Sequence, residues 1–507
     1  MKLKQLLYLI FISFSIAGIG QSGILDYQQL SQTYGLKHMH TLRAFLSLPC
    51  DANFKDDILK NVDWVENQFE QRGFTSLRLE TPTVPVLLLQ KMSDNTKAKT
   101  LMFYFHADGQ PVVPKEWSQE DPFVPVLKKQ NPETKKWEEV SFESQTNNFD
   151  PELRIFARAA SDDKGPGVML LAALDAIFDA GSKPNYNIKI LVDFEEEKGS
   201  TSLPAIVSQY KDLLKTDLLL ILDGPAHDSN LPTLSFGSRG IVTVTLTTYG
   251  SYSALHSGHF GNYVPNPAWR MVKLLSTMKT SSGKVVIQGF YDGVKIDKTT
   301  KDYLKTIPDN VPSLHKRLGI KRTDKVGESY RESLMYPSLN IRGLKSGEVA
   351  DLAGTIVPEK AVAEIDIRTV TQTPPDSLVK KLKSHILKHG YHIIDHDPTP
   401  DERAKYENLI KIQIRPPYGA FSTDISGSAA KWLESAIAKT TSEKVLKLPL
   451  MGGSLPITPF VTQLGVQAII LPTVNSDNNQ HSFDENLRLG NFVGGIKTLI
   501  GILSTDF

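Results

Sequence analysis

Apolar runs of strand length alternate with helical patterns between residue 51 and about residue 240. The runs lie at residues 101–105, 188–192 and 218–222, and a similar run follows at 468–471. Between the first two runs, apolar residues recur at helical spacing over residues 165–181. This alternation predicts a mainly parallel sheet flanked by helices, which is an α/β fold.

The middle of the chain has a different pattern. Half-exposed strands are predicted at residues 242–248, 361–367 and 391–394, with helices at 267–278 and 375–390 between them. This β-α-β-α-β order, interrupted by residues 281–358, predicts an inserted α+β domain. The polar residues 308–332 are interpreted as a loop. We therefore expect one domain in two parts, 21–240 and 416–507, and an inserted domain at 241–415.

Composition narrows the class of protein. The 507 residues are 40% hydrophobic, which is typical of a folded chain, and they are too many for a single core. With 57 Lys plus Arg against 56 Asp plus Glu, the chain has no bulk attraction for nucleic acid. The single Cys50 excludes an internal disulfide and any metal site with several thiolates.

The first residues resemble a secretory signal. Lys2 and Lys4 precede an apolar stretch, and the small residues Gly18 and Gly20 follow it. The apolar stretch is shorter than the roughly 20 residues needed to cross a bilayer. The pattern predicts a signal peptide over residues 1–20, a secreted or periplasmic protein, and no membrane association after cleavage.

Polar side chains stand where the predicted strands end. His106 and Asp108 follow the first strand, Glu195, Glu196 and Glu197 follow the second, Asp223 follows the third, and His481 comes after the last. The carboxyl ends of parallel strands meet at one edge of a sheet, so these side chains are expected to lie together. A single His or Asp at a strand end is usually a turn residue, but four coincident strand ends favour a site. Imidazole and carboxylate ligands without thiolate suit zinc or another divalent metal.

Five motifs in order carry a family resemblance. They are His106-x-Asp108, Asp162-Asp163-Lys164-Gly165-Pro166, Glu196-Glu197-Lys198-Gly199-Ser200, Asp223 and His481. Together they resemble the co-catalytic zinc metallopeptidases that include carnosinases, carboxypeptidase G and aminoacylase. Two further segments, residues 255–258 and 355–368, resemble the lid domain of the dipeptidase branch.

The resemblance implies a centre of two divalent metal ions bridged by Asp162. One ion would be completed by His106 and Asp223, and the other by Glu197 and His481. Zinc is the expected metal, with manganese or cobalt as alternatives.

The resemblance also implies catalytic roles. Asp108 would orient the imidazole of His106, and Glu196 would act as general base. Because Glu195 precedes them, the assignment of Glu196 and Glu197 could be displaced by one residue. His256 would reach the active site of a partner subunit and stabilise the oxyanion, which implies a homodimer.

Substrate contacts are implied at Arg368, which would bind a substrate carboxylate, and at the Gly453-Ser454 loop. Where dipeptidase relatives carry an Arg-Glu pair before Gly-Gly-Ser, this chain has Leu450-Met451, so the pocket is expected to be more apolar.

The resulting hypothesis is a metal-dependent hydrolase that cleaves dipeptides or short peptides with a free C-terminal carboxylate. An N-acyl amino acid amidohydrolase with the same mechanism is one alternative. A catalytically silent binding protein on the same fold is another, although clustered carboxylates without a cation are costly.

Overall fold

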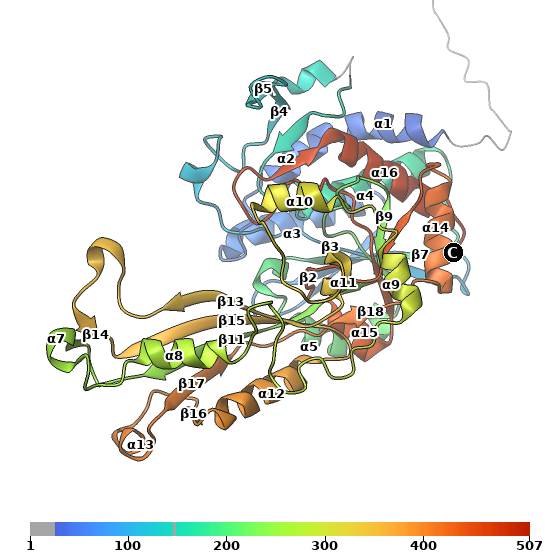
Figure 1. Ribbon diagram of the computed structural model, residues 1–507. Helices are drawn as coiled ribbons and strands as arrows, with labels where there is room; N and C mark the ends of the chain where they lie inside the picture. Colours follow the sequence, from blue (N-terminus) through green and yellow to red (C-terminus); the bar gives the residue numbers. More distant parts are fainter. Residues whose placement is uncertain (1–25, 146–148) are drawn as a thin grey trace, which may run out of the picture.

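Two sheets of different construction organise the chain (Figure 1). The structure is a computed structural model that describes residues 26–145 and 149–507. The predicted signal peptide at 1–20 lies outside the described residues. In this described part of the chain, no helix is long and apolar enough to cross a membrane.

The larger sheet has eight strands. In spatial order they are β1 (Thr75–Leu79), β2 (Val86–Lys91), β7 (Asn187–Asp193), β3 (Thr100–His106), β8 (Leu218–Ile221), β20 (Gln467–Ile470), β9 (Thr233–Ser235) and β19 (Leu446–Leu448). Parallel pairing joins β7 to β3, β3 to β8 and β8 to β20 at the centre, and the pairing is antiparallel towards β1.

Strand β3 shows why this sheet is buried on both faces. Leu101, Phe103 and Phe105 pack into one hydrophobic cluster, and Met102 and Tyr104 pack into another. Because successive side chains point to opposite faces, a continuous apolar run is needed where helices cover both. The first face is covered by α1 (Tyr27–Lys37), α2 (Met39–Leu46), α3 (Lys55–Glu70), α4 (Lys164–Asp179), α14 (Ser428–Ala438) and α16 (Leu489–Leu503), and the second by α5 (Leu203–Gln209), α6 (Lys211–Leu214) and α15 (Thr458–Leu464).

The second sheet is built entirely from residues 240–414. Its order is β13 (Ser338–Lys345), β15 (Lys360–Thr369), β11 (Gly240–Tyr249), β17 (Leu409–Ile414) and β16 (His392–Ile394). The alternating burial of β15 matches a strand with one covered face, and α8 (Pro267–Ser276) and α12 (Pro375–Lys388) supply the cover. This sheet extends away from the larger one (Figure 1).

Smaller elements complete the fold. A four-stranded sheet comprises β21 (Asn486–Arg488), β6 (Arg154–Phe156), β4 (Val126–Gln130) and β5 (Trp137–Val140). Strand pairs join β10 (Gly237–Ser238) to β18 (Phe421–Ser422) and β12 (Leu255–His256) to β14 (Ile356–Val357). The short helices are α7 (Ser257–Phe260), α13 (Pro400–Lys405), η1 (Pro114–Glu116), η2 (Phe142–Gln145), η3 (Glu196–Lys198) and η4 (Ala350–Leu352).

The polar segment 308–332 differs from its interpretation as a loop. It contains α10 (Val311–Leu318) and leads into α11 (Tyr330–Leu334), and α9 (Lys298–Leu304) precedes both. Asn310 and Ser329 cap α10 and α11 by accepting hydrogen bonds from backbone N–H groups. The helices are short and mostly exposed, so their sequence lacks the long apolar period by which helices are recognised.

Candidate metal centre

Five chain segments bring the predicted ligands to the carboxyl edge of the larger sheet. His106 is the last residue of β3, Asp223 follows β8, Asp162 precedes α4, and Glu197 lies in η3 after β7. His481 comes from the loop between β20 and β21. The parallel strands therefore deliver side chains from distant parts of the sequence to one place.

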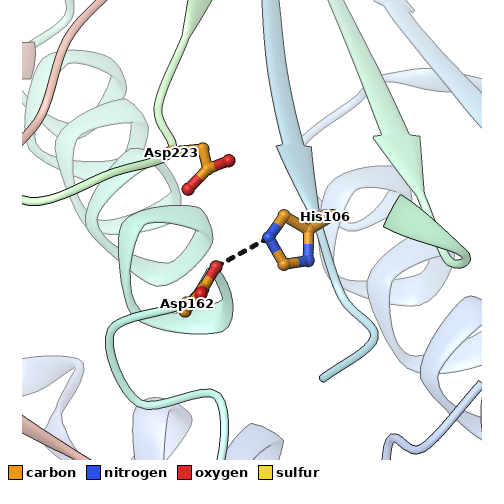
Figure 2. Close-up of side chains that lie close together, drawn as sticks. All are labelled: His106, Asp162 and Asp223. Carbon is orange, nitrogen blue, oxygen red and sulfur yellow. Dashed lines mark hydrogen bonds and ion pairs between the residues drawn. The ribbon is translucent and has the colours of Figure 1, made fainter. Parts of the chain in front are cut away.

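The first group of potential ligands is His106, Asp162 and Asp223. One ligand atom from each of the three lies within 4.8 Å of the others, and all three residues are buried. Figure 2 shows the side chains pointing toward one another, with His106 Nε2 2.9 Å from Asp162 Oδ1. This spacing suits a single ion held by one nitrogen and two carboxylates.

A second group shares Asp162 with the first. His481 Nε2 lies 3.0 Å from Asp162 Oδ2 and 3.3 Å from Glu197 Oε2. One ligand atom each from Asp162, Glu197 and His481 lies within 4.8 Å of the others. The two carboxylate oxygens of Asp162 thus face different groups, which is the arrangement that a bridging carboxylate requires.

The carboxylates of this site have perturbed pKa values. Burial, and after it the charge of Asp162, raises the pKa of Glu197 to about 7 and that of Asp223 to about 6. Burial also acts to raise the pKa of Asp162, but hydrogen bonds with His106 and His481 more than offset it and lower that pKa. The hydrogen bond with Asp162 raises the pKa of His481 to about 9. Carboxylates gathered in a buried place repel one another, and divalent cations are the charge that relieves this repulsion, so the donor set fits a metal centre.

Asp108 connects the end of β3 to the glutamate loop. Its carboxylate Oδ1 lies 3.3 Å from His106 Nδ1. The same carboxylate accepts hydrogen bonds from the backbone N–H groups of Glu196 at 3.1 Å and Glu197 at 3.0 Å. One buried side chain therefore holds both the imidazole and the backbone of two glutamates.

Glu196 and Glu195 differ clearly in their surroundings. Glu196 lines the same cavity as Asp162, Glu197 and Asp223, and burial together with the neighbouring carboxylates raises its pKa well above the usual range. Glu195 instead accepts a hydrogen bond from the Thr83 hydroxyl and lies 3.7 Å from Lys198 Nζ. The geometry favours Glu196 over Glu195 as the group that faces the cavity.

The cavity next to the metal centre has a volume of about 650 Å³ and also contains the predicted substrate contacts. Arg368 lies near the end of β15, where it pairs with Ile241 of β11. Its Nη1 donates to Ser454 Oγ at 2.7 Å, and Gly453 lies on the same wall. An arginine and a hydroxyl side by side can bind a carboxylate.

His256 is not brought to this cavity. It is exposed at the tip formed by β12, β14 and α7, where its Nδ1 accepts a hydrogen bond from the Gly258 N–H at 3.0 Å. This tip lies at the far end of the second sheet from β3 (Figure 1). Within one chain, His256 therefore does not contribute to the site.

Glu485 is a part of the site that sequence reasoning missed. Its Oε1 accepts hydrogen bonds from the N–H groups of Ser161 at 2.9 Å and Asp162 at 3.0 Å. Its Oε2 accepts from the Ala159 N–H and from Arg158 Nη1, at 2.9 and 2.8 Å. Glu485 thus fixes the loop that presents Asp162. The only sequence signal is an acidic residue four positions after His481, which is too weak to interpret alone.

Comparison with known proteins agrees with this geometry. The model of the peptidase family M20/M25/M40 matches residues 102–505. The Cys-Gly metallodipeptidase DUG1 of Candida albicans is 26% identical over 91% of this chain and 92% of its own length. The human Beta-Ala-His dipeptidase is 23% identical over 82% of this chain and 76% of its own length.

A solved structure supports the fold directly. The M20 family metallo-carboxypeptidase Sso-CP2 from Sulfolobus solfataricus superimposes with a TM-score of 0.76 at 26% identity, covering 92% of this chain and 98% of its own. These similarities confirm the resemblance carried by the five motifs and the predicted α/β fold. They support a metal-dependent peptidase over the alternative of a catalytically silent binding protein.

The predicted location is wrong. The N-terminal pattern predicts a secreted or periplasmic protein. The yeast Cys-Gly metallodipeptidases that the chain resembles over about nine-tenths of its length are cytosolic. An apolar stretch after two lysines is a short and common pattern, and it carries less information than a match over the whole chain.

Proposed function

The chain belongs to peptidase family M20/M25/M40 and is a metal-dependent peptidase, and from this premise we propose that it hydrolyses dipeptides with a free C-terminal carboxylate. The observation that carries the proposal is the position of Arg368 and Ser454 in a cavity that members of both groups of potential metal ligands also line, namely Asp162, Glu197, Asp223 and His481. A carboxylate bound there would place the preceding amide bond within reach of the centre.

We propose two divalent ions, with zinc as the expected metal. His106, Asp162 and Asp223 would hold one, and Asp162, Glu197 and His481 the other, so three protein side chains would hold each ion. When bound, the ions polarise the scissile carbonyl and lower the pKa of water.

The residues around the centre would carry out proton transfer, hold the catalytic groups in place and orient the substrate. Glu196 takes a proton from the attacking water and delivers it to the leaving amine. Asp108 holds the His106 ring and the backbone of Glu196 in place, and Arg368 with Ser454 orients the substrate by its carboxylate.

We further propose a homodimer in which the partner's His256 stabilises the oxyanion. Two observations support it: His256 is exposed far from the cavity of its own chain, and apolar side chains are exposed on the same part of the fold. Exposed fractions are 85% for Tyr263, 67% for Trp269 and 77% for Val349. In this arrangement, residues 241–415 are the lid and dimerisation domain, and residues 21–240 and 416–507 are the catalytic domain.

The test uses purified protein that is first stripped with a chelator and then reloaded with zinc, manganese or cobalt. Dipeptides should be hydrolysed only after reloading, and the same dipeptides with a C-terminal amide should be poor substrates. N-acyl amino acids form the second panel, because Met451 on the cavity wall could accept an acyl group. Hydrolysis of N-acyl amino acids without hydrolysis of dipeptides would replace the proposed substrate class.

A further inference from the structure

The polar insertion, here called the cover segment (residues 297–336), folds back onto the larger sheet beside the cavity. The Tyr303 hydroxyl donates to the Lys447 carbonyl at 2.8 Å, and Leu304 and Ile307 pack with Leu448 of β19. Helices α10 and α11 of this segment contribute residues to the cavity wall. The segment thus belongs to the inserted part of the sequence but forms one side of the substrate site.

A partly buried polar cluster holds α11 against the loop that carries Asp223. The Asp309 carboxylate accepts two hydrogen bonds from Arg331 Nε, at 3.0 and 2.9 Å, and one from Nη2 at 2.7 Å. His227 Nε2 lies 3.0 Å from Asp309 Oδ1. Because His227 Nδ1 accepts from the Ser229 N–H at 3.1 Å, Nε2 carries the hydrogen and donates to Asp309. A bidentate, partly buried contact of this kind fixes the position of the helix.

Beside this cluster, two apolar side chains, Met451 and Leu334, line the cavity. A β-carbon placed on Gly224 would lie 3.3 Å from Met451 Sδ, so Met451 covers the residue after Asp223. A β-carbon placed on Gly452 would lie 3.5 Å from Leu334 Cδ2, so Leu334 of α11 lies against the residue after Met451.

The loop from Met451 to Ser454 relates these two side chains to the substrate. Its last residue, Ser454, contacts Arg368, and its first residue, Met451, lies against Gly224. If the substrate carboxylate is bound at Arg368, the part of the substrate on the other side of the scissile bond extends towards Met451 and Leu334.

The charged residues on this side are already paired with one another. Asp309 is bound by Arg331 and His227, and Asp228 lies 3.2 Å from Arg317. A charged substrate side chain would lose water here and meet a thioether and a leucine, which is unfavourable, whereas an apolar side chain gains from the same contact.

We propose that Met451 and Leu334 form the subsite for the side chain of the N-terminal residue, and that the enzyme selects dipeptides in which this residue is apolar. This inference rests on the proposed dipeptidase function.

The test compares kcat/KM for Leu-Gly, Met-Gly, Lys-Gly and Asp-Gly with the zinc-loaded protein. The kcat/KM values for Leu-Gly and Met-Gly should exceed those for the two charged dipeptides by at least about tenfold, which is the scale of discrimination that an apolar pocket provides. Equal values for all four would overturn the subsite but leave the dipeptidase function standing. Hydrolysis of none would overturn both.

Substitutions at Met451 and Leu334 test whether these two residues cause the preference for an apolar N-terminal residue. Met451→Glu and Leu334→Glu should each raise the ratio of kcat/KM for Lys-Gly to kcat/KM for Leu-Gly by about tenfold or more, because the new carboxylate pairs with the substrate lysine. Met451→Gln, which adds no charge, should reduce the preference for Leu-Gly without favouring Lys-Gly. The matched control is Leu318→Glu on α10, since Leu318 is 56% exposed and does not line the cavity. If Leu318→Glu changes the ratio as much as Leu334→Glu, the effect is one of general charge and the subsite is wrong.

Discussion

At the scale of single residues, neighbouring carboxylates have different roles because their surroundings differ. Glu195, Glu196 and Glu197 are consecutive, yet one contacts Thr83, one faces the cavity, and one lies 3.3 Å from His481. From the sequence alone, the general base and the metal ligand could be displaced by one position among these three residues. Their different contacts in the structure distinguish them.

A pair of isosteric substitutions tests this separation. Glu196→Gln should keep both metal ions but lower kcat by about 10²- to 10⁴-fold, because the general base is lost. Glu197→Gln should lower the metal content itself. Metal analysis of the purified variants, together with dipeptide hydrolysis, distinguishes the two. A Glu196 variant with normal turnover would show that the base is another group.

Glu485 gives a residue-scale prediction about stability. In Glu485→Gln, an amide N–H₂ group would face donors that now point at a carboxylate, and buried Arg158 would lose its charge partner. Breaking a buried pair in this way should lower the free energy of unfolding by about 3 kcal/mol. Denaturant unfolding measures it, with exposed Glu443→Gln as the control. An equal effect of the two substitutions would mean that the contacts of Glu485 contribute little.

At the scale of elements, helices on one face of the larger sheet are joined by a polar contact at their ends. Asp175 of α4 accepts hydrogen bonds from Arg72, which follows α3, at 2.7 and 2.8 Å. It also lies 2.9 Å from His38 Nε2, between α1 and α2. One carboxylate therefore links the ends of four helices that are otherwise held by apolar packing.

This link should make stability depend on pH. Burial acts to raise the pKa of Asp175, but the contacts with His38 and Arg72 lower it to about 2. An unfolded aspartate titrates near pH 4, so the contribution is complete above about pH 4 and is lost as the pH falls towards 2. Asp175→Asn should cost about 2 kcal/mol of unfolding free energy at pH 7, with the difference from the unmodified protein shrinking below about pH 4.

Urea unfolding of both proteins between pH 2 and 7 measures this difference, and exposed Asp94→Asn serves as the control. A difference that stays constant across this range would assign the effect to packing and not to the charge of Asp175.

At the scale of the whole molecule, the arrangement of His256 predicts sites shared between two chains. His256→Ala and Glu196→Gln should each be inactive alone. When the two variants are mixed and allowed to exchange subunits, the mixed dimer combines an intact Glu196 with the partner's His256 in one of its two sites. About one quarter of the unmodified activity should then return. A mixture that stays inactive although light scattering and exchange show mixed dimers would exclude the shared site.

Much of the fold and of the candidate centre could be predicted from the sequence because both depend on local patterns. The buried strands β3, β7, β8 and β20 have continuous apolar runs, and the residues that follow them meet at one edge by the geometry of parallel pairing. The cover segment was missed because its short helices have little apolar period, and the secreted location was wrong because it depended on one short apolar stretch.

The sequence by itself therefore determined the class of fold, the family and the residues gathered near His106. Tertiary structure alone decided that Glu485 supports Asp162, that His256 lies away from its own cavity, and that Leu334 meets the loop after Met451. The physical reason is the range of the interactions. Strand and helix periods are set by neighbours a few residues apart. The contacts of Glu485 and Leu334 join segments more than a hundred residues apart, and nothing local in the sequence encodes which such segments will pack together.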